Sequence, residues 1–210
     1  MNAPISFTAA PSVVAFPVQV PAGFTPTDCD GDGDDRGPTG KVCAGYDGPD
    51  YRPRWGGGFD APRGPQRLAH RAIDIMAAEG CLVVAPSSCI VLAAATSPKG
   101  GHHVYLRDLG GWVWYMAHMR DKPLVIEGAE LVAGDVVGYV GRTGNAVRKT
   151  AAGLRGCPHL HLSLTVPRGA RLPRQILGPD GKPVARRGEK VDPVPFLRPV
   201  YDAGGWRRSA

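Results

Sequence analysis

Short runs of apolar or alternating residues predict strands through the middle of the chain. The strand candidates are "CLVVAP", "CIVLAAA", "HHVYLRD", "GWVWYMAH", "LVAGDVVGYVG" and "HLHLSLTV", at 81–86, 89–95, 102–108, 111–118, 131–141 and 159–166. The turn Leu109-Gly110-Gly111 is typical of a hairpin between two of them. The only helix-like stretch is weak and lies near residues 145–153. The pattern predicts a mainly β fold, a compact antiparallel sheet with long loops.

The same pattern divides the chain into three parts. Residues 1–55 are rich in Pro, Gly and Asp and have no period, so we expect an irregular N-terminal extension. "GGG" at 56–58 opens a denser region, and we expect one domain over residues 56–197. Residues 198–210 form a short basic end.

Composition agrees with a β-rich, loop-rich chain. Its 210 residues suit one domain with extensions, and the 29 Gly and 21 Pro favour turns. The net charge of +6 is unevenly spread, since residues 168–210 carry ten Lys or Arg against four acids. A basic end suits an anionic partner such as a cell-wall polymer, a lipid surface or nucleic acid, or simply keeps the protein soluble.

The sequence gives no sign of a membrane span or of a well-formed export signal. No apolar run approaches the roughly 18 residues that a transmembrane helix needs. The first 24 residues are apolar but lack Lys and Arg and are broken by four prolines, which makes a poor signal peptide.

Five cysteines leave at least one unpaired within a single chain. Cys29 and Cys43 bracket an acidic loop, and Cys81 and Cys89 flank a strand–turn–strand, where they could face each other across a hairpin. Two such disulfides would suit an oxidising compartment and would leave Cys157 over.

Two pairs of polar residues share strand faces. His159 and His161 are two apart and point to one side, while Leu160 points to the other. His70 and Asp74 also share a face in an extended segment, and a buried Asp there would need a charge or a metal to balance it. Each pair taken alone is also compatible with an ordinary exposed strand face.

Taken together, the histidines and the aspartate form a more specific pattern. His70-x-x-x-Asp74, an isolated His118 after a Tyr-bearing strand, and His159-x-His161, in that order, resemble the lysostaphin-type zinc metallopeptidases that cut peptidoglycan. The resemblance covers roughly residues 56–197. It includes "HRAIDIMAAEGCLVVAP", "PHLHLSL", "VDPVPFL" and a glycine series at Gly128, Gly134, Gly138, Gly141 and Gly144.

The resemblance implies a role for each of the five residues. His70, Asp74 and His161 match the ligands of one zinc ion per chain, and His118 and His159 match two catalytic histidines that do not bind the metal. Three protein ligands leave a fourth position open, as a catalytic zinc requires. His159 can act as general base, and His118 can orient the water or stabilise the developing oxyanion, while the sequence leaves open which of the two takes the proton.

The chain departs from the family at several positions. Ala72 replaces a usual Gly, and Met116 stands where the family has Tyr. Tyr115, three residues before His118, would face away from it in a regular strand, so a bulge or a lost contact is implied.

The loop before the last motif is enlarged. Fourteen residues separate Gly144 from His159, which indicates an insertion at 145–158. Arg148, Lys149 and Arg155 in it could meet substrate carboxylates or could simply be solvated.

Three other features compete for a role. Asp28, Asp30, Asp32 and Asp34 fit the first half of a calcium loop, but Thr39 stands where its closing Glu belongs, so a solvated acidic loop is the alternative. His102 and His103 are expected at the surface. Cys157 lies near histidines, but nothing supplies the rest of a cysteine peptidase.

The sequence thus predicts a zinc-dependent endopeptidase that hydrolyses peptide bonds in peptidoglycan stem peptides or cross-bridges. The alternatives are a non-catalytic wall-binding or hydrolase-activating module on the same fold, and a zinc peptidase for Gly-rich proteins. Peptidoglycan is the expected partner, and nucleic acid is not expected. We expect an extracytoplasmic protein or a phage-encoded lytic protein.

Overall fold

The protein was analysed as a computed structural model. It describes residues 10–22, 52–63, 68–146, 148–150, 153–155, 157–169 and 175–208.

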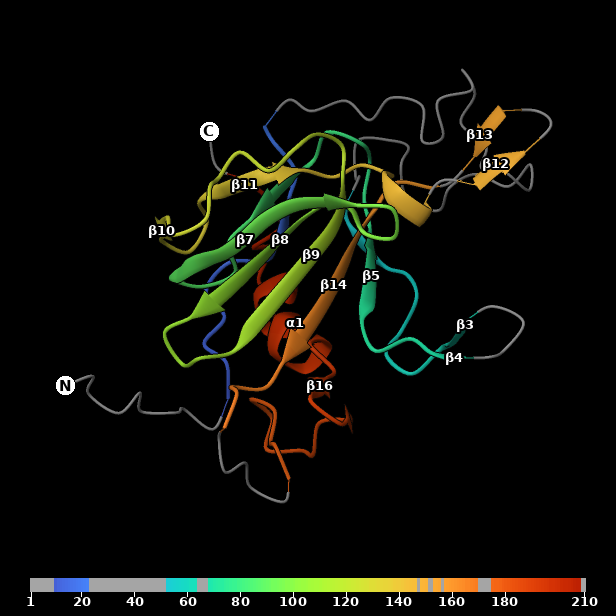
Figure 1. Ribbon diagram of the computed structural model, residues 1–210. Coiled ribbons are helices and arrows are strands. Elements are labelled where there is room, and N and C mark those ends of the chain that lie inside the picture. Colours follow the sequence, from blue (N-terminus) through green and yellow to red (C-terminus); the bar gives the residue numbers. More distant parts are fainter. Residues whose placement is uncertain are drawn as a thin grey trace.

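One large antiparallel sheet organises the molecule (Figure 1). Its central strands, in spatial order, are β7 (Cys89–Ser97), β8 (Gly101–Asp108), β9 (Val113–Met119), β14 (His159–Thr165) and β5 (Ile73–Met76). Four short strands complete its edges: β10 (Glu130–Leu131), β16 (Lys190–Val191), β15 (Arg186–Arg187) and β2 (Arg54–Trp55). The prediction of a mainly antiparallel β fold is confirmed.

Three smaller sheets accompany the large one. A three-stranded sheet contains β1 (Val18–Gln19), β6 (Leu82–Val84) and β11 (Val136–Tyr139). Two hairpins, β3 (Pro62–Arg63) with β4 (Leu68–Ala69) and β12 (Arg148–Thr150) with β13 (Gly153–Arg155), project away from the main sheet (Figure 1).

The two faces of the large sheet differ in character. On β14, Leu160, Leu162 and Leu164 are fully buried, as are Trp114 and Met116 on the neighbouring β9. The residues between them on β14 point to the opposite face and are polar, because side chains alternate along a strand. One face therefore carries the core, and we call the other, which carries the histidines, the site face.

A helix that the sequence pattern did not predict packs on the core face. Helix α1 (Val194–Asp202) buries Phe196 and Leu197, and the Phe196 ring lies 6.4 Å from that of Trp112. The sequence pattern did not indicate this helix because the segment contains several prolines. A proline in the first turn of a helix nevertheless costs no backbone hydrogen bond.

The predicted weak helix near 145–153 is wrong. A single 3-10 turn, η1 (Gly144–Ala146), is followed instead by the β12–β13 hairpin. The enlarged loop therefore has strand structure of its own.

The expected Cys81–Cys89 disulfide is also wrong. Strand β6, which follows Cys81, pairs with β1 and β11, whereas β7, which begins at Cys89, pairs with β8 and β10. The two strands do not form a hairpin, and both cysteines are buried and form no disulfide. No disulfide joins two of the described residues. Cys157 is disulfide-bonded rather than left over. Cys29 and Cys43 lie outside the described residues.

Segments outside residues 56–197 contribute to the core. Phe16 and Val18 are fully buried near the N-terminus, and Trp206 is buried near the C-terminus. Among the described residues, no helix has the length and apolar character needed to cross a membrane.

Candidate metal centre

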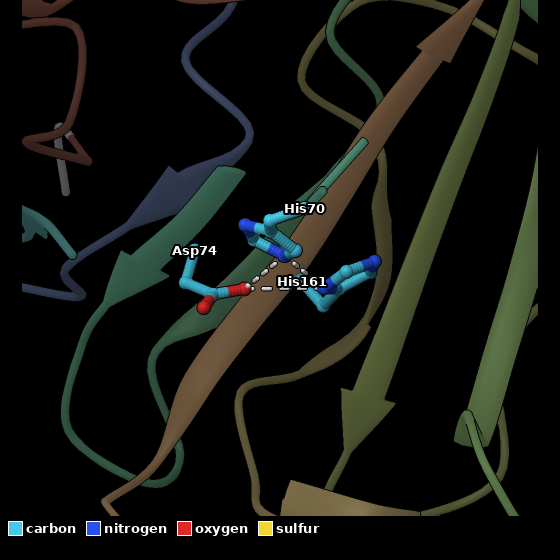
Figure 2. A group of neighbouring side chains, drawn as sticks. All are labelled: His70, Asp74 and His161. Carbon is cyan, nitrogen blue, oxygen red and sulfur yellow. Dashed lines mark hydrogen bonds and ion pairs between the residues drawn. The ribbon is translucent and has the colours of Figure 1, made fainter. Parts of the chain in front are cut away.

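Three side chains converge at one end of β14 on the site face. His161 Nδ1 lies 3.1 Å from Asp74 Oδ1, His70 Nε2 lies 3.2 Å from His161 Nδ1, and His70 Nε2 lies 3.4 Å from Asp74 Oδ1 (Figure 2). His70 and Asp74 are buried, and His161 is partly buried. One nitrogen from each histidine and one carboxylate oxygen thus point at a common centre.

Strand pairing brings these residues together from distant parts of the sequence. In the antiparallel pair of β14 and β5, His161 stands directly opposite Asp74, so both side chains rise on the same face. His70 immediately precedes β5 and is tied to its neighbourhood by backbone hydrogen bonds with Asp60 and Ala61. The expectation that His70 and Asp74 share a face is confirmed.

The spacing of the three donor atoms fits a zinc ion. Zinc bonds of about 2.0–2.2 Å at tetrahedral angles place ligand atoms about 3.3–3.5 Å apart. The separations of 3.1, 3.2 and 3.4 Å are close to that value. Two imidazoles and one carboxylate are also a donor set that zinc accepts, so the residues present fit this metal.

A backbone carbonyl sets the ring nitrogen that His70 presents to the cluster. His70 Nδ1 lies 3.2 Å from the Gly58 carbonyl, which can only accept, so Nδ1 carries the proton and Nε2 keeps a lone pair for a metal. His161 presents its other nitrogen, Nδ1, to the cluster.

The charge on Asp74 is stabilised by the histidines around it. Burial alone would raise the pKa of this carboxyl, but hydrogen bonds with His161 and His70 and the nearby His159 hold the pKa well below its usual range. Burial, as the largest cause, lowers the pKa of His161 and so favours its neutral form. A carboxylate with neutral imidazoles is the protonation state that binds a metal.

His118 and His159 lie beside the cluster without belonging to it. The His118 ring centroid is 4.9 Å from that of His159 and 5.6 Å from that of His161. His159 Nε2 is 3.9 Å from Asp74 Oδ1. All five residues singled out in the sequence therefore meet at one place.

Backbone carbonyls orient both of these histidines in the same way. His118 Nδ1 donates to the Thr143 carbonyl at 2.8 Å, and His159 Nδ1 donates to the Cys157 carbonyl at 2.9 Å. Each neutral ring therefore keeps its lone pair on Nε2. Burial, followed by the neighbouring His159 and His161, lowers the pKa of His118 to about 4, so at neutral pH it is an unprotonated base.

A bulge in β9 explains why Tyr115 and His118 lie on the same face of the sheet. The pairing of β8 with β9 shifts register between Val104–Met116 and His102–Met119, and His118 adopts a positive φ of 68°. The extra residue places His118 on the site face together with Tyr115, whose ring lies 6.1 Å from that of His161. The bulge that the sequence implied is thus present.

Sequence reasoning missed Thr143. Its hydroxyl donates to the Met119 carbonyl at 2.7 Å and accepts the His102 N–H at 3.0 Å, while its own carbonyl accepts from His118. Thr143 thus holds the bulge and His118 in one arrangement. The glycine series that ends at Gly144 was the available signal, because glycines mark a close approach of the backbone.

One expectation about histidines is wrong. His103 is buried rather than at the surface, with Nδ1 donating to the Gly101 carbonyl at 2.9 Å and its ring beside Tyr105 and Tyr115. His102 is half-buried and contacts Thr96 Oγ1 at 2.7 Å. Because side chains alternate along β8, His103 points to the site face, where Tyr115 of the neighbouring β9 lies beside it. The sequence alone does not show that β8 and β9 are neighbours.

Two expectations lie outside what the structure describes. The acidic run with Asp28, Asp30, Asp32 and Asp34 falls outside the described residues, and so do the side chains of Arg148, Lys149 and Arg155.

Known structures share this fold. The catalytic domain of lysostaphin from Staphylococcus simulans is 25% identical, with a TM-score of 0.51, over 70% of this chain and 92% of that one. A putative glycyl-glycine endopeptidase from Ruminococcus gnavus is 20% identical, with a TM-score of 0.56, over 91% of this chain and 62% of that one. LytU is 22% identical, with a TM-score of 0.52, over 74% of this chain and 92% of that one.

The share of the matched protein that this chain covers differs from one solved structure to another. In the solution structure of lysostaphin, which is 23% identical with a TM-score of 0.50, this chain covers 53% of the length. The sequence comparison with curated proteins found no match.

A family model agrees with the metal centre. The model of peptidase family M23 matches residues 68–174, about half of the chain. That range contains the three residues of the cluster, His70, Asp74 and His161, and the two neighbouring histidines, His118 and His159. The chain therefore belongs to peptidase family M23, of the lysostaphin type.

Proposed function

We propose that the protein is a zinc-dependent endopeptidase that hydrolyses peptide bonds in the stem peptides or cross-bridges of peptidoglycan. The observation that carries this proposal is the complete set of His70, Asp74 and His161 at zinc-ligand spacing, with two further histidines beside it. It implies an extracytoplasmic or phage-encoded protein whose partner is the cell wall.

In this proposal His70, Asp74 and His161 hold one zinc ion. When bound, the metal supplies the positive charge that makes water more acidic and a peptide carbonyl more electrophilic. The Gly58 carbonyl keeps the His70 ring turned so that Nε2 faces the centre. The low pKa of Asp74 keeps its carboxylate ionised at neutral pH.

His159 and His118 serve as the groups that handle protons. Each has Nδ1–H fixed by a backbone carbonyl, so each presents the lone pair of Nε2. His159 Nε2 lies near the ligand set and takes the proton of the attacking water as general base. His118, neutral at pH 7, orients that water by accepting a hydrogen bond and can donate to an oxyanion only after it has gained a proton.

Hydrolysis of purified sacculi tests the proposal. We expect the zinc-loaded protein to release peptides that mass spectrometry identifies, to lose this activity with a chelator and to regain it with zinc. His161→Ala should abolish both zinc binding and peptide release. The matched control is His102→Ala, which changes a histidine that contacts Thr96 and lies outside the cluster.

The outcomes also separate the alternatives. Wall binding without metal or peptide release would indicate a non-catalytic wall-binding or activating module. Digestion of elastin or of a Gly-rich peptide in preference to sacculi would indicate a peptidase for proteins. Retained hydrolysis of sacculi by His161→Ala would contradict the assignment of the ligands.

A further inference from the structure

A lysine lies on the site face with its ammonium group fixed by two hydroxyls. Lys190 Nζ donates to Ser163 Oγ at 2.9 Å and to Thr165 Oγ1 at 2.8 Å. An ammonium has three N–H donors, so one remains for another acceptor. No feature of the metal centre described above uses this group.

Strand geometry places this ammonium on the same face as the metal cluster. Ser163 and Thr165 follow His161 on β14 at spacings of two and four residues, so all three side chains point to one side. Lys190 stands opposite Thr165 in the pairing of β14 with β16, which puts it on that side as well. The core face carries Leu164 and Val191 at the neighbouring pair.

One side chain, that of Tyr115, lies beside both the metal cluster and the strand segment that holds Lys190. Tyr115 stands opposite Ser163 and reaches toward His161, with its ring 6.1 Å from that of the histidine. Two residues of strand span about 7 Å, so the ammonium lies about one or two such steps from the metal ligands. An extended peptide advances about 3.3–3.6 Å per residue, which makes this distance about two to four substrate residues.

Among the described residues, no group of opposite charge forms an ion pair with Lys190. Within the part of the chain that the structure describes, no carboxylate lies within 4.0 Å of its nitrogen. The adjacent Glu189 is exposed and acts on it only through the field of its charge. Burial lowers the pKa of Lys190, which means that an incoming anion would relieve a real desolvation cost.

We propose that Lys190, held by Ser163 and Thr165, binds a carboxylate of the substrate about two to four residues from the bond that is cut. The proposal rests on the proposed peptidase function and adds a substrate class to it: peptides that carry a free carboxylate, such as that of an unamidated diaminopimelate, in preference to the corresponding amides. A charge-assisted hydrogen bond from a positioned ammonium supplies the discrimination.

Two synthetic peptides that differ only in this carboxylate and its amide test the proposal. For the zinc-loaded wild type we expect kcat/KM to be about tenfold higher for the carboxylate peptide, the size of effect that a hydrogen bond to a charged group gives. In Lys190→Met the ratio should fall to about one, and in Lys190→Arg it should be partly restored. Lys182→Met is the control, because it removes an equal charge from an exposed lysine that pairs with Asp180.

A purely structural role for Lys190 predicts a different result. If the lysine only ties β16 to β14, Lys190→Met should lower thermal stability and leave the ratio of the two kcat/KM values as in the wild type. An unchanged ratio in Lys190→Met, or a wild type without a preference, would overturn the proposal.

Failure of the peptidase function itself is distinguishable. If the zinc-loaded wild type cleaves neither peptide, the proposed function is contradicted, and calorimetric binding of the same two peptides then tests Lys190 alone. Tighter binding of the carboxylate peptide by wild type than by Lys190→Met supports the subsite, and equal binding by both proteins overturns it.

Discussion

At the residue scale, the arrangement separates two kinds of histidine by the place of their ring nitrogens relative to Asp74. His70 and His161 present a nitrogen to the centre shared with Asp74, whereas His118 and His159 present Nε2 from beside it. The separation makes their proposed roles testable one at a time.

Removing an unliganded histidine should uncouple metal binding from hydrolysis. We expect His159→Ala to keep about one zinc per chain and to lower kcat by about 10²- to 10⁴-fold, the usual contribution of a general base. Elemental analysis and peptide release from sacculi measure the two effects. Loss of zinc from His159→Ala would mean that this residue is a ligand.

The low pKa of His118 predicts a pH dependence of stability in the metal-free protein. Because the folded pKa of about 4 lies below the ordinary 6.5, the unfolded chain binds more protons between these values. The contribution of this group is therefore fully present above pH 6.5 and is lost as the pH falls to about 4, on the order of 3 kcal/mol.

The variant His118→Asn tests this pH dependence. Asn does not titrate and tolerates the positive φ at this position. Urea unfolding of the chelated proteins should show a shallower decline toward acid for the variant. An identical slope in both proteins would contradict the assigned cause.

At the element scale, two turns are in contact and position the backbone that holds His118. The turn at Gly101 leads into β8, and the turn at Gly144 precedes the enlarged loop, and both glycines have positive φ, 61° and 70°. A Cβ on either would collide with the backbone of the other turn. This contact lets Thr143 reach His118.

A substitution at this contact should lower the free energy of unfolding by more than the strain of a positive φ alone. We expect Gly144→Ala to lower the free energy of unfolding by at least about 2 kcal/mol and to reduce hydrolysis, because strain and collision add. Gly134→Ala is the matched control, with a positive φ of 92° but open space around it, and should cost about 1 kcal/mol. Denaturant titration measures both, and equal losses would show that the contact between the turns is unimportant.

At the scale of the whole molecule, the N-terminal segment with Phe16 and Val18 packs into the core. The Phe16 ring lies 5.6 Å from that of Trp55 and 5.1 Å from that of Tyr201, so it joins the start of the sheet to α1. Strand β1 adds backbone pairing to β6 just after it. The segment before the family match is therefore part of the fold.

Truncation of Phe16 should reveal this contribution. We expect Phe16→Ala to destabilise the protein by about 3–5 kcal/mol through the cavity it leaves. Val14→Ala, in the same segment but 68% exposed, should change stability by less than about 0.5 kcal/mol. Thermal unfolding compares them, and a small effect of Phe16→Ala would mean that the segment packs loosely.

The sequence by itself determined the central strands and the types of residue at the site. Period-two alternation put His159 and His161 on one face and Leu160 on the other, and the spacing of four positions between His70 and Asp74 put these two on one face, because these relations depend only on local backbone geometry. The types of residue then fixed the donor set, since two imidazoles and a carboxylate suit zinc.

Only the tertiary structure decided which strands lie together. It put β6 and β7 in different sheets, so that Cys81 and Cys89 form no disulfide, and it buried His103. It also supplied Thr143 to orient His118 and set Lys190 beside Ser163. These outcomes depend on pairing between residues far apart in the chain, and pairing is selected by the burial of the whole core rather than by any local pattern.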